Sequence, residues 1–89
     1  MDAPERATRV LVAEDEPHIR RTLSFILEKE KLEVIIAGDG EEALATALRE
    51  KPDLILMDVM MPKRDGISVL QALRKTDGFE AMPVILLTA

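Results

Sequence analysis

The sequence predicts an α/β fold in which a doubly wound parallel sheet carries helices on both of its faces. Four short runs consist only of apolar residues, at positions 10–13, 34–37, 54–57 and 84–87. A strand with one wet face alternates apolar and polar residues, whereas a strand of a parallel sheet covered on both faces is apolar throughout. Helical patterns lie between these runs, and this alternation of strands and helices is typical of a parallel sheet.

Three segments carry apolar residues at the spacing of one helix face. They run from Pro17 to about Glu30, from Glu41 to Glu50 and from Ile67 to about Lys75. Pro17 suits the first turn of a helix because its fixed φ matches the helical value. The acidic start of the second segment suits the positive end of a helix dipole. Residues rich in Gly, Pro and Asp separate the elements as turns, at 38–40, 51–53 and 77–78.

The handedness of the connections predicts which face each helix covers. Crossovers between parallel strands are right-handed. If the second and third strands lie on opposite sides of the first, the first helix covers one face alone. The other two helices then share the opposite face. One helix is thin cover for strands that are apolar on both faces.

The composition excludes several classes of protein. The chain has 89 residues, which is room for one small domain. It has no Cys, which excludes disulfides and Cys-ligated metal sites. Its 17 acidic and 12 basic residues give a net charge of −5, which argues against nucleic-acid binding through this segment. No apolar run approaches the about 20 residues that cross a membrane.

The first residues of the chain read as a short polar leader. Residues 1–8 lack the apolar stretch of a signal peptide. We therefore expect a flexible leader at 1–8, a domain at 9–89 and a cytoplasmic location.

Acidic residues follow the first and third strands of the predicted sheet. Glu14, Asp15 and Glu16 follow the first, and Asp58 follows the third, 43 positions after Asp15. Ligands of open α/β sheets bind outside the carboxyl ends of the strands, where the strand order reverses. If these two strands flank that point, their carboxylates meet and repel one another unless a cation lies among them. Mg²⁺ fits best because it prefers oxygen ligands and retains water.

Asp58 beside bound Mg²⁺ is a candidate nucleophile. Carboxylates attack phosphoryl groups and hold them as acyl phosphates. The metal neutralises charge on the transferring oxygens, which is most of what phosphoryl transfer requires. The fourth strand is followed by Thr88, whose hydroxyl is on the same rim and can donate a hydrogen bond to a phosphoryl oxygen.

Three motifs together resemble the receiver domain of bacterial two-component response regulators. They are the acid pair Glu14-Asp15 after an apolar strand, the run 58–66 (DVMMPKRDG) and the closing Thr88-Ala89. The middle run is the most specific, because Met-Pro and Asp-Gly stand at defined offsets from the acceptor. The resemblance covers residues 10–89. It implies a flavodoxin-like parallel sheet with strand order 2-1-3-4.

The resemblance also implies a role for each residue of the site. Asp58 would accept a phosphoryl group from a sensor histidine kinase. Asp15 would bind Mg²⁺ directly and Glu14 through water, and the backbone carbonyl of Met60 would complete the protein ligands. Thr88 would be the switch hydroxyl that moves toward the phosphoryl group. The chain would thus be a substrate of the kinase and not an enzyme, although its own residues would assist its phosphorylation.

The sequence departs from this family at its end. A full receiver has a fifth strand, which carries a lysine, and two further helices. Without them the fourth strand has an open edge. We expect the sequence to be a fragment. The alternatives are a deliberate truncation and a complete chain whose edge a second chain covers, as in a homodimer.

Other functions compete with phosphate acceptance. Glu14, Asp15 and Glu16 are also the acids expected to cap the helix that begins at Pro17. A truncated receiver would then act as a protein interaction module through its exposed strand. A phosphatase that forms an aspartyl phosphate is a third possibility. It would want a second Asp two residues after the nucleophile, where Met60 stands.

Overall fold

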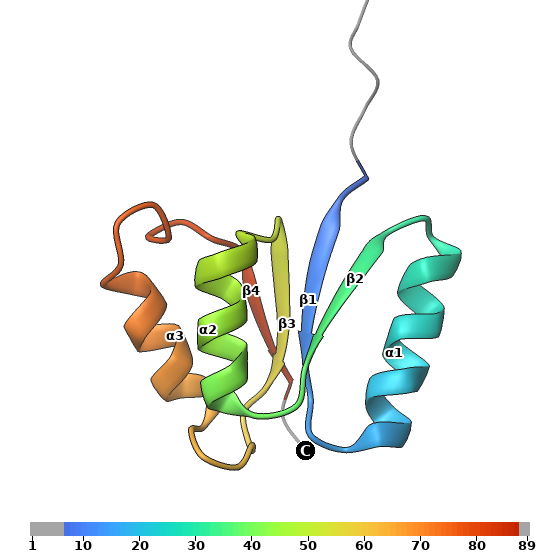
Figure 1. Ribbon diagram of the computed structural model, residues 1–89, viewed down its shortest axis with the longest axis horizontal. Helices are drawn as coiled ribbons and strands as arrows, with labels where there is room; N and C mark the ends of the chain where they lie inside the picture. The colour runs from blue at the N-terminus through green and yellow to red at the C-terminus, as the bar shows by residue number, and fades with distance from the viewer. Residues whose placement is uncertain (1–6, 88–89) are drawn as a thin grey trace, which may run out of the picture.

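The computed structural model describes residues 7–87 as seven alternating elements (Figure 1). Each predicted strand and helix is confirmed, with bounds that differ by no more than one residue from those expected. The elements are β1 (Arg9–Ala13), α1 (Pro17–Lys29), β2 (Glu33–Ala37), α2 (Gly40–Glu50), β3 (Leu54–Asp58), α3 (Gly66–Arg74) and β4 (Val84–Leu87).

The four strands form one parallel sheet in the order β2-β1-β3-β4, which confirms the predicted topology. Ala13 is paired with both Ala37 and Met57 at the carboxyl ends of the three strands. The residues that follow β1 and β3 therefore leave the sheet side by side. This edge of the sheet lies at the bottom of Figure 1, where α1 also begins.

The main hydrophobic core lies between the sheet and the pair α2 and α3. Its buried members from the strands alternate along each strand and include Leu11 and Met57, while Ala47 and Leu73 come from the two helices. Helix α1 contributes no residue to this core and instead lies against β1 and β2. Its position beside β2, away from α2 and α3, is visible in Figure 1.

The expected full burial of all four strands is right for β1 and wrong for β2 and β4. It is wrong in part for β3, where Leu54 and Leu56 are only partly buried. Val10, Leu11, Val12 and Ala13 of β1 are buried. By contrast, Ile36 of β2 is 47% exposed and Ile85 of β4 is 49% exposed. Both belong to the row of the sheet that includes Val12, which is not the row that packs on α2 and α3. The cause is that α1 alone covers this face of the sheet. The sequence predicted that a single helix would be thin cover there.

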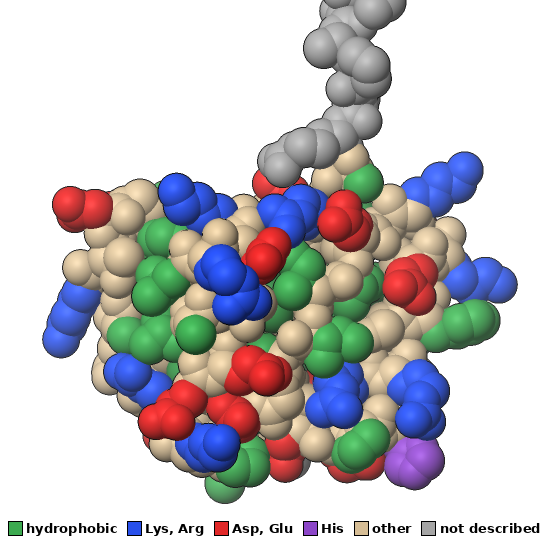
Figure 2. Space-filling view, viewed as in Figure 1, with side chains coloured by type: hydrophobic (Ala, Val, Ile, Leu, Met, Phe, Trp, Pro, Cys, Tyr) green, Lys and Arg blue, Asp and Glu red, His purple; other side chains and the backbone are tan. Residues whose placement is uncertain are grey.

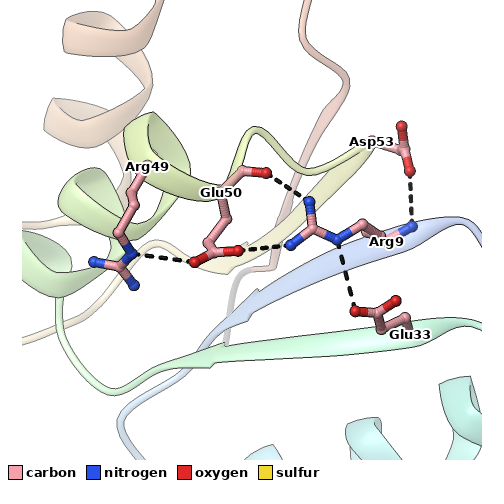
Figure 3. A network of polar contacts seen from close by, with 5 residues as sticks. All are labelled: Arg9, Glu33, Arg49, Glu50 and Asp53. Carbon is pink, nitrogen blue, oxygen red and sulfur yellow. Dashed lines mark hydrogen bonds and ion pairs between the residues drawn. The ribbon is translucent and has the colours of Figure 1, made fainter.

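Arg9, in β1, contacts three other segments of the chain at the amino ends of the strands (Figure 3). Its guanidinium donates to the backbone carbonyl and the side chain of Glu50, each at 2.7 Å, and lies 3.7 Å from Glu33. The Arg9 N–H donates to Asp53 at 2.8 Å. Arg49 reaches the other carboxylate oxygen of Glu50 at 3.1 Å. This cluster, the Arg9 network, connects β1, β2, the end of α2 and the turn before β3.

Charges are mixed on the side of the molecule that carries α2 and α3. Figure 2 shows acidic and basic side chains interspersed there, with no single basic stripe on the face in view. Within residues 7–87, no helix is both long enough and apolar enough to cross a membrane.

Candidate functional site

Three carboxylates meet at the carboxyl edge of the sheet, as the sequence predicted. Glu14 and Asp15 follow β1, and Asp58 ends β3. One oxygen of each lies within 4.8 Å of the others. This grouping follows from the pairing of Ala13 with Met57, which places the two strand ends next to each other.

Burial and mutual repulsion act on the most enclosed of the three carboxylates. Glu14 is only 4% exposed, whereas Asp15 is exposed and Asp58 partly so. Burial raises the pKa of Glu14 above its ordinary value, and the charges of Asp58 and Asp15 raise it further. The Glu16 N–H donates to Glu14 at 3.0 Å and opposes this shift of the pKa. Negative charge is therefore concentrated where a cation would relieve it.

The donor set fits Mg²⁺. All three side chains offer carboxylate oxygens, which Mg²⁺ prefers to nitrogen or sulfur. Asp15 and Asp58 keep contact with solvent, so a metal bound between them could retain the waters that it holds strongly.

Helix capping accounts for Glu16 but not for Glu14 or Asp15. Both carboxylate oxygens of Glu16 accept hydrogen bonds from the first turn of α1, from the N–H of His18 at 3.0 Å and of Ile19 at 3.2 Å. This cap leaves the other two acids to face Asp58. Arg20, whose role the sequence did not predict, donates to the Glu14 carbonyl at 3.0 Å and fastens the start of the loop to α1.

A loop, residues 59–65, carries the chain from Asp58 into α3. A carboxylate oxygen of Asp58 accepts from the Met60 N–H at 3.2 Å. Asp65 caps α3 by accepting from the Ser68 N–H at 2.8 Å. A Cβ on Gly66 would lie 2.5 Å from the Asp58 carbonyl oxygen. Glycine is thus required there by the close approach of backbone to the acceptor.

The other two predicted site residues, Met60 and Thr88, are not part of the carboxylate cluster. Met60 lies on the loop directly after Asp58, and its side chain is exposed. Thr88 lies outside the described residues, so its predicted hydroxyl role stays a prediction. Gly40, at the start of α2, also contacts this loop, because its N–H donates to the Pro62 carbonyl at 3.2 Å. No motif in the sequence signals that contact, which depends on how α2 meets the loop.

Comparison with known proteins agrees with this geometry. The model of the response regulator receiver domain family matches residues 10–89. The alkaline phosphatase synthesis transcriptional regulatory protein PhoP of Bacillus subtilis is 48% identical over 81 residues, which cover 91% of this chain and 33% of PhoP. The chain spans about a third of the length of the curated relatives it matches.

Solved structures of receiver domains superpose closely on the chain. The receiver domain of the Francisella response regulator 1452 has a TM-score of 0.86 and 39% identity, covering 92% of this chain and 66% of that one. The response regulator TrrA of Thermotoga maritima, solved in complex with Mg²⁺ and BeF, has a TM-score of 0.86 and 39% identity, covering 92% and 70%. With sequence, fold and acidic edge in agreement, the chain belongs to the response regulator receiver domain family.

Proposed function

We propose that this chain accepts a phosphoryl group from a sensor histidine kinase onto Asp58, with Mg²⁺ bound beside it. One observation carries the proposal: Glu14, Asp15 and Asp58 bring their oxygens within 4.8 Å of one another at the open edge of the sheet. Such a group is unfavourable without a cation, because burial and like charge both oppose ionisation. Among these acids, Asp58 ends a strand and remains open to a donor.

The chain's own residues have distinct parts in this proposal. Asp15 and Asp58 would hold Mg²⁺ directly, the Met60 carbonyl would be a third ligand, and Glu14 would act through a water molecule. When bound, Mg²⁺ supplies positive charge that neutralises the phosphoryl oxygens. Arg20 keeps the acid pair in place through the Glu14 carbonyl. TrrA, which was solved with Mg²⁺ and BeF, supports this choice of metal by analogy.

The proposed transfer exchanges one phosphorus bond for another. An oxygen of the Asp58 carboxylate attacks phosphorus while the bond to the kinase histidine nitrogen breaks. The nitrogen keeps the electron pair of that bond, and the imidazole regains a proton from solvent. An acyl phosphate on Asp58 results, and the Thr88 hydroxyl would donate a hydrogen bond to one of its oxygens. The chain is a substrate in this step and assists it by positioning charge.

Binding of beryllofluoride, a mimic of the phosphoryl group, tests the proposal without a kinase. We expect calorimetry to detect binding of beryllofluoride only when Mg²⁺ is present, and none in Asp58→Ala. Asp65→Asn is the matched control, since it removes a nearby carboxylate but keeps an amide oxygen to cap α3. Equal binding by Asp58→Ala and the unsubstituted chain would contradict the proposal.

An interaction module is the second candidate, and exposed apolar side chains favour it. Ile85 of β4 and Ile36 of β2 are each about half exposed on the face that α1 covers. Within residues 7–87, β4 is paired only with β3. A chain that binds a partner through this edge but never binds Mg²⁺ or beryllofluoride would match this second candidate instead.

A further inference from the structure

The loop that follows Asp58 is held from two sides. At its start, the Val59 N–H donates to the Leu87 carbonyl at 3.1 Å, and the Val59 carbonyl accepts from Gly66 at 2.8 Å. At its far limb, the Pro62 carbonyl accepts from the Gly40 N–H of α2 at 3.2 Å and from the Arg64 N–H at 2.7 Å. Met60 and Met61 lie between these two attachments.

Helix α2 meets the far limb of this loop without room for a side chain. A Cβ on Gly40 would lie 1.7 Å from the Arg64 carbonyl oxygen and 2.7 Å from the Arg64 Cβ. Gly40 is buried, and its φ is not in the left-handed region. Close contact with the loop, and not an unusual backbone conformation, therefore requires glycine at this position.

An ion pair lies at the same contact. Asp39 caps α2 by accepting from the Glu42 N–H at 2.8 Å. Its other carboxylate oxygen lies 3.5 Å from the Lys63 ammonium, on the loop. Lys63 itself has a φ of 69°, in the left-handed region that most residues avoid. The first N–H groups of a helix have no partner within the helix, and α2 uses one of them to hold the Pro62 carbonyl.

We infer that Gly40 is a positioning residue, and that the start of α2 is a seat that fixes the loop after Asp58. This inference rests on the proposed function, because what the seat would position is the Met60 carbonyl relative to Asp58. Mutation of a group that orients a metal ligand typically lowers metal affinity by about 10–100-fold. Helix α2 would thus control the Mg²⁺ site without touching the metal.

Substitution of Gly40 by alanine tests the inference, with Gly38→Ala as the matched control. A Cβ on Gly38 would lie 3.4 Å from the end of the Arg20 side chain and 3.8 Å from that of Glu42. Both are ordinary contacts, so that variant should leave the loop and the acid pair in place. For Gly40→Ala we expect the Mg²⁺ concentration at half-maximal phosphorylation by a small phosphodonor to rise about tenfold or more. The rate at saturating Mg²⁺ should change far less. A merely structural role would lower the melting temperature without moving this half-maximal concentration.

A second variant covers the case in which Gly40→Ala does not fold. The Lys63 side chain is 61% exposed, so Lys63→Met should fold normally. Loss of a nearby positive charge would by itself strengthen Mg²⁺ binding. Weaker Mg²⁺ binding in Lys63→Met, with recovery in Lys63→Arg, would therefore reveal positioning. Stronger binding in Lys63→Met would contradict it.

Amide NMR spectra separate this inference from the proposed function. If the unsubstituted chain binds no Mg²⁺, the proposed function fails. The seat is then judged from the amide shifts of residues 59–61 and 63–65, which should move in Gly40→Ala and stay in Gly38→Ala. Unmoved shifts of these residues in a folded Gly40→Ala variant would overturn the inference whether or not Mg²⁺ binds.

Discussion

At the residue scale, two charged side chains at opposite ends of the sheet have contrasting energetics. Arg9 is surrounded by carboxylates and makes two short hydrogen bonds to Glu50. Glu14 is buried beside two other carboxylates and receives a single backbone hydrogen bond. Arg9 therefore stabilises the fold. Ionised Glu14 destabilises it, because its position in the site buries its charge beside two other carboxylates.

Replacing Arg9 should destabilise the chain. Arg9→Met keeps an apolar stem but loses the hydrogen bonds to Glu50, so we expect the free energy of unfolding to fall by about 1–3 kcal/mol. Urea unfolding followed by circular dichroism measures this loss. Arg49→Met is the control, because the Arg49 side chain is 65% exposed and its ion pair should contribute less than about 1 kcal/mol. Equal losses in the two variants would show that the Arg9 network does not hold these segments together.

Neutralising Glu14 should stabilise the chain near neutral pH when Mg²⁺ is absent. Since folding raises the pKa of Glu14, its ionisation costs stability as pH rises through that folded-state pKa. Glu14→Gln removes this cost and can still accept from the Glu16 N–H. We expect the gain to be largest at pH 7 and to shrink toward the ordinary Glu pKa of about 4.3. Thermal unfolding across this range checks the trend, and a gain that grows toward low pH would contradict it.

At the element scale, an acidic side chain caps the N-terminus of each of the three helices α1, α2 and α3. Glu16, Asp39 and Asp65 accept hydrogen bonds from the first turns of α1, α2 and α3. These caps fix where each helix starts and hence where the loops at the carboxyl edge of the sheet turn. The caps of α2 and α3 lie on the two sides of the loop that follows Asp58.

Removing the cap of α3 should cost measurable stability. We expect Asp65→Ala to lower the free energy of unfolding by about 1 kcal/mol, because the Ser68 N–H loses its acceptor. Asp65→Asn preserves the acceptor and should stay within about 0.5 kcal/mol of the unsubstituted chain. Urea unfolding of both variants measures the difference. If Asp65→Asn is as unstable as Asp65→Ala, charge and not capping explains the role of Asp65.

Local signals in the sequence predicted the elements and the acidic cluster well. Pro17 and the unbroken apolar runs set the bounds of helices and strands, because those signals lie within each element. The meeting of Asp58 with Glu14 and Asp15 followed from strand order and the rule that parallel strands end at one edge. The contacts of Gly40 were not predictable in this way, since they depend on the distance at which α2 passes a loop more than 20 residues away.

At the scale of the whole molecule, the two faces of the sheet differ in cover. Helices α2 and α3 enclose one face, while α1 leaves apolar side chains half exposed on the other. Besides Ile36 and Ile85, α1 itself exposes Ile19, Phe25 and Ile26. Exposed apolar surface of this kind favours association or loose packing. The right-handed crossovers and the expected strand order predicted that one face of the sheet would be poorly covered. They did not predict that β2 and β4 would be the most exposed strands on that face.

The isolated 89-residue chain should therefore self-associate or unfold easily. Sedimentation velocity should detect dimers or larger species that decrease in Ile85→Ser, since this substitution removes apolar surface from β4. Ser24→Ala on α1 is the control, because it removes no apolar side chain. A monomer with a steep, cooperative urea transition would contradict this expectation.

Phosphorylation of Asp58 is the central claim, and intact mass spectrometry tests it most directly. The chain is incubated with a small phosphodonor, with Mg²⁺ or with a chelator, beside Asp58→Ala and Asp65→Asn. We predict the mass of one phosphoryl group on the unsubstituted chain and on Asp65→Asn when Mg²⁺ is present, and no gain in Asp58→Ala or with the chelator. A gain that persists in Asp58→Ala, or no gain in any sample, would contradict the assignment of Asp58 as the acceptor in this chain.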